Sequence, residues 1–189
     1  MSEVKRETLC FNQPGDQNTD AVLNRVKDYS NAEGIDDIVV ASTTGETGAK
    51  AAKTFKGKNL VVVSHSYGFK EAGKSEMLER FRSEIISNGG KIFAGTHALS
   101  SIERAIRKEF GSIQPLEIVA NVLRLFGEGT KVGVEISLMA ADAGLIPMDK
   151  DIICIGGTGR GADTALRIRP AHTSSFFELR IKEIIARPY

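Results

Sequence analysis

The chain has 189 residues, about one average domain, and 41% of them are hydrophobic, which is enough to form one full core. Twenty-five Lys and Arg stand against 24 Asp and Glu, and this near balance argues against a nucleic-acid-binding surface or a polybasic membrane patch. No apolar run approaches the roughly 18 residues of a membrane span, and residues 1–11 lack the apolar segment of a signal peptide. We therefore expect a cytoplasmic protein with no membrane or nucleic-acid partner.

The cysteines and histidines show no metal-ligand spacing. Cys10 and Cys154 are far apart, and Cys154 lies within an apolar run where a reduced, buried thiol is expected. His65, His97 and His172 have no companions at the spacing of a metal site. The sequence predicts neither a disulfide framework nor a bound metal.

The first half of the chain alternates strand-like runs with helical patterns. A helix is expected from Asn18 or Thr19, with its apolar residues at helical spacing, and Gly34 ends it. Three strand–loop–helix units follow. Their strands are expected over 38–41, 60–64 and 91–94, and their helices over 49–53, around 77–86 and after Ser100 or Ser101.

The second half continues the pattern with two helices and a buried strand. Pro115 suits the start of a helix that Gly127 closes, and residues 131–143 fit a helix better than the strand that their alternation also allows. Strand 151–155 opens the glycine-rich segment 156–163. Residues 166–168 and 179–185 are expected to form late, outer strands. The sequence thus predicts an α/β fold of three α/β/α layers, with a mostly parallel sheet covered by helices on both faces.

The connections are short, and no linker divides the chain, so a single domain over 1–189 is expected. In such a sheet, loops leaving the carboxyl ends of the strands gather at one edge, where ligands bind. Four loops rich in Gly, Ser, Thr or His meet this condition. They are 42–48, 64–68, 95–101 and 156–163.

The loop Thr43–Gly48 has the composition of a phosphate site. Its glycines let backbone N–H groups approach an anion, its threonines add hydroxyl donors, and the following helix points its positive end at the charge. The alternative is an ordinary helix cap with a tight turn. Glu46 is the residue of this loop that opposes anion binding.

Two further strings match nucleotide-binding patterns. Gly157-x-Gly159-x-x-Ala162 fits a loose dinucleotide fingerprint, but tight packing of a glycine turn explains it equally well. Gly68–Ser75 satisfies G-x-x-x-x-G-K-S, yet no predicted strand ends in the Asp that would hold magnesium. His65 and His97 follow strands and are candidates for acid–base chemistry or for capping a turn.

Four segments together resemble the stand-alone family of pyruvate kinase α/β (C-terminal) domain-like proteins, found mostly in archaea. They are ASTTGETGAKAA (41–52), GTHALS (95–100), MAADAG (139–144) and IGGTGRGADTA (155–165). The resemblance covers nearly the whole chain. It implies an α/β/α domain without the catalytic barrel, so pyruvate kinase activity is not expected. In full-length enzymes the loop matching Ser42–Gly48 holds a sugar-bisphosphate effector.

The same resemblance implies a bound flavin mononucleotide (FMN). The loop 43–48 would hold its phosphate, residues after the next two strands would line its ring, and 156–161 would close over the ribityl chain. The implied residues are Ser42, Thr43, Thr44, Gly45, Thr47, Gly48, Ser64, His65, Tyr67, Thr96, Gly156, Gly157, Thr158, Gly159 and Gly161.

Three functions are therefore open. The first is an FMN-binding protein, either a flavoenzyme of unassigned substrate or a flavin-responsive module. The second is a non-catalytic effector domain that binds a sugar phosphate and acts through a partner. The third is a nucleotide hydrolase that uses Lys74 in Gly68–Ser75. Catalytic residues and a homo-oligomeric state stay unassigned at this point.

Overall fold

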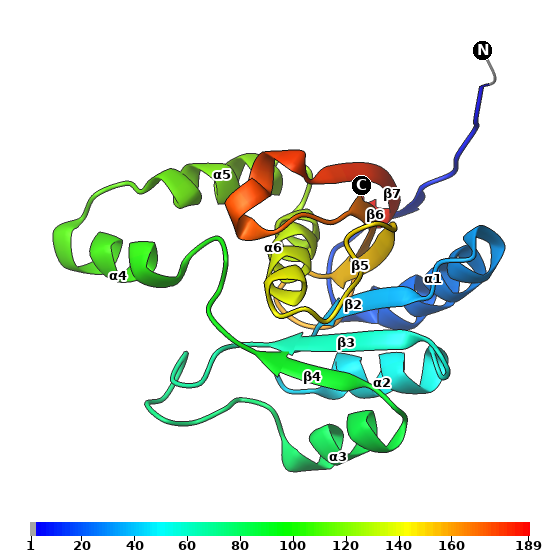
Figure 1. Ribbon diagram of the computed structural model, residues 1–189, viewed down its shortest axis with the longest axis horizontal. Coiled ribbons are helices and arrows are strands. Elements are labelled where there is room, and N and C mark those ends of the chain that lie inside the picture. Colours follow the sequence, from blue (N-terminus) through cyan, green and yellow to red (C-terminus); the bar gives the residue numbers. More distant parts are fainter. Residues whose placement is uncertain (1–2) are drawn as a thin grey trace.

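Strand and helix alternate along the chain so that one sheet is built with helices on both faces. The computed structural model describes residues 3–189 (Figure 1). Seven strands lie in the order β1-β7-β6-β5-β2-β3-β4. They are β1 (Leu9–Phe11), β2 (Asp37–Ala41), β3 (Asn59–Ser64), β4 (Lys91–Ala94), β5 (Ile152–Gly156), β6 (Thr164–Arg169) and β7 (Arg180–Pro188). The helices are α1 (Thr19–Glu33), α2 (Glu46–Thr54), α3 (Glu79–Ser87), α4 (Ser101–Phe110), α5 (Pro115–Arg124) and α6 (Glu128–Asp142), with short 3-10 turns at Asp16–Asn18 and Thr173–Glu178.

The half of the sheet that carries the glycine-rich loops is parallel. Strand β2 lies between β5 and β3, with Val39 paired to Cys154 on one side and Val61 on the other, and β4 extends the set. Strand β6 is antiparallel to both β5 and β7, while the short strand β1 is parallel to β7. The α/β prediction is confirmed, and the carboxyl ends of β2, β3 and β5 open on the same edge.

Alternating side chains of the central strands build one core on each face of the sheet. Ile38 and Val40 of β2 belong to the core under α1 and α2, whereas Val39 between them faces α6. All three are fully buried, and each contributes roughly 1.5–3 kcal/mol by leaving water. Figure 1 shows α1, α2 and α3 on one side of the sheet and α5 and α6 on the other.

Most predicted elements are present, with small differences at their ends. Gly34 ends α1 in the left-handed conformation, and residues 131–142 are helical, as expected. Helix α3 begins at Glu79 instead of near 77. Strand β1 was not predicted, because three residues are too short for a periodic signal. It also corrects the expectation that residues 166–168 and 179–185 form outer strands, since β6 lies between β5 and β7 and β1 covers the other edge of β7.

No helix among residues 3–189 is both long and apolar enough to cross a membrane.

Candidate functional site

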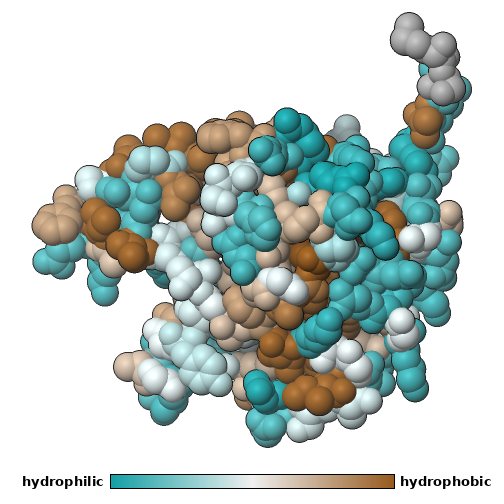
Figure 2. Space-filling view, viewed as in Figure 1, coloured by the Kyte–Doolittle hydropathy of each residue, from teal (hydrophilic) through white to brown (hydrophobic). Residues whose placement is uncertain are grey.

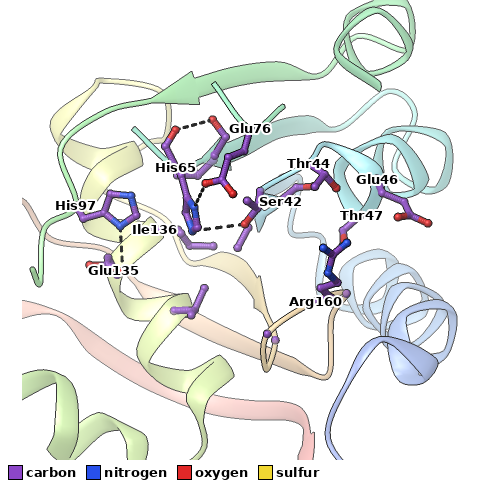
Figure 3. A pocket seen from close by; sticks show the side chains of 18 of the residues that line it. Ser42, Thr44, Glu46, Thr47, His65, Glu76, His97, Glu135, Ile136 and Arg160 are labelled. Carbon is purple, nitrogen blue, oxygen red and sulfur yellow. Dashed lines mark hydrogen bonds and ion pairs between the residues drawn. The ribbon is translucent and has the colours of Figure 1, made fainter. Parts of the chain in front are cut away.

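A cavity of about 320 Å³ lies where the carboxyl ends of β2, β3 and β5 meet. The loop after β2 and the start of α2 form one wall, the glycine loop 157–161 forms another, and α6 closes the base (Figure 3). The volume falls within the roughly 300–1,000 Å³ of small-molecule sites. This arrangement agrees with the predicted position at the strand ends.

The amino-terminal turn of α2 presents unpaired donors to this cavity. Ser42 Oγ accepts the N–H of Gly48 at 3.0 Å, so the loop caps its own helix. The N–H groups of Glu46 and Thr47 have no hydrogen-bond partner among residues 3–189. Gly45, with φ of 94°, adopts a left-handed conformation that glycine tolerates best. Free donors and the positive end of a nine-residue helix favour an anion at this position.

The glycine loop is held by a buried carboxylate. Asp163 is fully buried, and its Oδ2 accepts the N–H groups of Gly15 and Thr158 at 3.0 and 3.1 Å. The loop therefore has a defined shape that carries Arg160 to the cavity. Figure 3 shows the Arg160 guanidinium directed toward Thr47, while the carboxylate of Glu46 points away from the other labelled side chains. A guanidinium beside free N–H groups adds a second donor set for an oxyanion.

His65 is oriented by a carboxylate and faces a hydroxyl. Its Nδ1 lies 2.8 Å from Glu76 Oε2, and its Nε2 lies 3.4 Å from Thr43 Oγ1. A carboxylate accepts only, so Nδ1 donates to Glu76 and Nε2 is left to accept the Thr43 hydroxyl or a ligand donor. All three residues line the cavity, and His65 and Glu76 are labelled in Figure 3. His65 and Glu76 both belong to the irregular loop 65–78, whose last residue, Leu78, donates its N–H to the Thr44 carbonyl at 3.0 Å.

A buried charge network supports the opposite wall. Glu135 of α6 pairs with Lys131 Nζ at 2.5 Å, accepts the N–H of Leu99 at 3.0 Å and lies 3.8 Å from His97 Nδ1. Burial raises the pKa of Glu135, but contact with His97 and the charge of Lys131 outweigh burial and hold it at about 2. The N–H of Ser66 donates to His97 Nε2 at 3.4 Å. Glu135 is therefore a carboxylate that fixes the loop carrying His97.

The base of the cavity is apolar. The lining side chains there are Ala41, Val63, Val132, Ile136 and Met139. A ligand in this space would meet polar groups at one end and along the rim, and hydrocarbon beneath. That division suits a molecule with an anionic group and a flat, largely apolar body.

A second cavity of about 300 Å³ shares His65, His97 and Glu135 with the first. Phe69 lies against the two histidine rings. The centroid of its ring is 4.0 Å from the centroid of the His65 ring and 5.2 Å from that of the His97 ring. The guanidinium of Arg104 lies 4.6 Å above the Phe69 ring. The histidine pair thus forms part of the wall of both cavities.

The predicted binding residues divide into two groups. Nine of them line the first cavity: Ser42, Thr43, Thr44, Thr47, Ser64, His65, Gly157, Gly159 and Gly161. The other six lie outside its lining: Gly45, Gly48, Tyr67, Thr96, Gly156 and Thr158.

Packing and exposure explain four members of the second group. A Cβ on Gly48 would lie 2.6 Å from Val62, so this glycine allows α2 to approach the sheet. Gly156 is the last residue of β5, and a Cβ there would lie 2.6 Å from the Gly129 carbonyl. Tyr67 is 64% exposed, and Thr96 lines a separate groove beside α4.

Sequence reasoning missed several residues that contribute to the cavity. Glu76 and Glu135 lie far from the glycine-rich loops in the chain, and only the fold brings them to the histidines. The i, i+4 spacing of Lys131 and Glu135 in the sequence is compatible with an ion pair, but the same spacing is common on solvated helix faces. Arg160 lies inside a predicted loop, where it could have been included as a cation.

The string Gly68–Ser75 does not adopt the geometry of a phosphate-binding loop. Helix α3 begins at Glu79, so Lys74 and Ser75 precede it instead of forming its first turn. The Lys74 side chain is 67% exposed and pairs with Glu71 at 2.5 Å. The local pattern is present, but its residues lie outside the cavity lining.

No protein-family model matches the chain. A pyruvate kinase from Cryptosporidium parvum matches at 12% identity and a TM-score of 0.39, over 79% of this chain and 22% of the other. The chain thus spans about a fifth of the length of that enzyme. A match at this level says nothing about what this chain binds.

Proposed function

We propose that the protein binds a small phosphate-bearing ligand in the first cavity, and that this ligand is FMN. The observation that carries the proposal is the convergence of free N–H groups at the start of α2 with the Arg160 guanidinium at one end of the cavity. Backbone donors, a helix amino terminus and an arginine are the groups that bind phosphate in proteins. Thr43, Thr44 and Thr47 add hydroxyl donors beside them.

The remaining walls suit the rest of a flavin. The apolar base formed by Val63, Ile136 and Met139 can cover one face of a planar ring, and His65 offers a hydrogen-bonding atom at its edge. Gly157 and Gly159 permit close approach of the linking chain. When bound, FMN would supply hydride or electron transfer. A sugar phosphate, the second candidate, would leave the apolar base without a matching surface, so the base favours the flavin.

The first experiment is an absorption spectrum of the purified protein before and after denaturation, followed by titration with FMN and riboflavin. These two flavins share the ring and the ribityl chain and differ only in the phosphate. We expect FMN to bind about tenfold or more tightly than riboflavin, because charge-assisted hydrogen bonds contribute roughly 1.5–3 kcal/mol. Equal affinities would contradict the assignment of the phosphate end.

A matched pair of variants tests whether Arg160 binds the phosphate. Arg160→Gln is expected to weaken FMN binding and leave riboflavin binding unchanged. Lys74→Gln, which removes an exposed cation outside the cavity lining, is expected to change neither. If no flavin binds and sugar phosphates stabilise the protein against heat, the effector-domain alternative replaces FMN. If ATP binds and Lys74→Gln abolishes that binding, the nucleotide hydrolase replaces both.

A further inference from the structure

Helix α4 carries apolar residues on one side but contributes no buried residue to the protein. Ile102, Ile106 and Phe110 recur every four residues, which places them along one face. Ile102 and Phe110 are 76% and 75% exposed. A stripe of this kind normally packs against a core, whereas within residues 3–189 Ile106 is only half-buried and the other two side chains stay largely in solvent.

Helix α5 has two apolar faces, and only one of them is covered. Ala120 and Leu123 pack into the core that α6 forms with the sheet. Ile118, Val122 and Leu125 recur at i, i+4 and i+7 on another face and are 56%, 53% and 80% exposed. Packing on the body of the protein uses one stripe, and the second is left in contact with solvent by residues 3–189.

Polar contacts join the two helices and turn their apolar residues outward. Glu103 Oε2 accepts the N–H of Leu116 at 2.8 Å, and Arg107 pairs with Glu117 at 2.7 Å. The buried residue Leu99 anchors the start of the pair by donating its N–H to Glu135. We call residues 101–126 the arm. Figure 1 shows it projecting from the sheet, and Figure 2 shows apolar residues gathered over it.

The exposed apolar surface of the arm has the extent of a stable interface. Its large side chains that are at least half exposed are Ile102, Phe110, Ile113, Ile118, Val122, Leu125 and Phe126. Monomeric proteins rarely show an apolar patch beyond about 300–600 Å². A standard interface buries roughly 800 Å² on each partner around an apolar centre, and seven large apolar side chains that are at least half exposed can supply such a centre.

The charges around the arm indicate what covers it. The arm contains four cations and three carboxylates, and a fourth carboxylate follows it at once. They are Arg104, Arg107, Lys108 and Arg124 with Glu103, Glu109, Glu117 and, after the arm, Glu128. A surface for anionic lipid or nucleic acid would carry an excess of cations. A balanced, mixed rim around an apolar centre can instead pair with a second copy. About a two-fold axis residue i of one copy meets residue j of the other and j meets i, so any cation–carboxylate contact across the axis forms twice.

We propose that the arm is a dimer interface, through which two copies of this chain associate about a two-fold axis. An open groove of about 620 Å³, lined by Phe93, Ala98, Ile102, Leu116 and Met139 among others, lies at the base of the arm. It continues the apolar surface toward the body and provides space for side chains of the second copy. The interface does not depend on the ligand of the first cavity.

Sedimentation velocity on the full chain at micromolar concentration tests this proposal. We expect a particle of twice the 20.4 kDa chain mass. Leu125→Glu and Ile118→Glu place charges in the exposed stripe of α5 and are expected to raise the dimer dissociation constant at least about tenfold, the effect of roughly 1.4 kcal/mol. Ile86→Glu is the control, because Ile86 is 54% exposed on α3, outside the arm. It should leave the dimer intact.

Circular dichroism and thermal unfolding establish that each variant is folded. If a glutamate variant unfolds, Ile113→Ser in the connection between the helices is a milder substitution at a 77% exposed position. A wild-type monomer throughout the concentration range would overturn the proposal. A dimer that all arm variants leave unchanged would also overturn it. The same holds for a monomer that floats with neutral lipid vesicles and loses this behaviour in Leu125→Glu, since the arm would then be a membrane contact.

Discussion

His65 Nδ1 and Glu76 Oε2 lie 2.8 Å apart, although the two residues are eleven positions apart along an irregular loop. The carboxylate fixes both the orientation of the ring and the position of its proton, and it turns Nε2 toward Thr43 and the cavity. A histidine held in this way is a preorganised acceptor. Its contribution to ligand binding therefore depends on a residue that need not touch the ligand.

Glu76→Ala is expected to weaken FMN binding about fivefold, because the ring loses one orienting hydrogen bond worth roughly 1 kcal/mol. Glu76→Gln retains an acceptor for Nδ1 and should bind within about twofold of wild type. Isothermal titration at one pH measures both. Equal losses in the two variants would mean that the charge of Glu76, and not its orienting role, is what matters.

The Lys131–Glu135 pair is expected to make stability sensitive to acid. Burial by itself would raise the pKa of Glu135, but contact with His97 and Lys131 outweighs burial. The pKa falls from 4.5 to about 2 in the folded protein. A lowered folded-state pKa contributes stability that is fully present above about pH 4.5 and is lost as the pH falls toward 2. The contribution is about 3 kcal/mol. Denaturant unfolding at several pH values measures it.

The double variant Lys131→Met/Glu135→Gln is the control for this pH dependence. It keeps an acceptor for the Leu99 N–H but has no buried charge, so its stability should vary less between pH 5 and 2. Lys131→Met alone leaves Glu135 buried without its cation and is expected to cost about 3–5 kcal/mol. A single variant as stable as the double would show that the pair is already well solvated.

Two glycines of the same loop offer a matched test of packing. Gly159 and Gly161 have φ of 76° and 69°, so alanine is strained at both by about 1–2 kcal/mol. A Cβ on Gly159 meets open space, whereas one on Gly161 would overlap Asp16 and Thr19 at the start of α1. Gly161→Ala should therefore cost a further 1–3 kcal/mol or so. Thermal unfolding of the two variants compares them, and equal losses would contradict the close contact.

The two thiols are expected to differ in reactivity. Cys154 is fully buried in β5, and burial raises the pKa of its thiol, while Cys10 is exposed. In the native protein a thiol-reactive probe should modify Cys10 alone, and denaturant should release the second equivalent. Mass spectrometry of the labelled peptides identifies the site. Rapid native labelling of Cys154 would indicate that the central sheet opens readily.

Local sequence determined the elements and the general position of the site. Apolar periodicity predicted α1 and α6 and the central strands, and Gly34 marked a helix end because its left-handed conformation favours glycine. The Thr- and Gly-rich loop after β2 was recognisable as a candidate anion site because its donors come from adjacent residues. These signals operate over a few residues and do not depend on the rest of the chain.

The tertiary structure decided which of the predicted residues share one cavity. Gly48 and Gly156 resemble ligand-binding glycines in sequence, but close packing against Val62 and Gly129 assigns them to the core. The same kind of long-range packing brings Glu76 and Glu135 to the two histidines, and places the second apolar face of α5 in solvent. Contacts between distant segments depend on how the elements pack together, and for that reason periodicity and local motifs alone could not predict them.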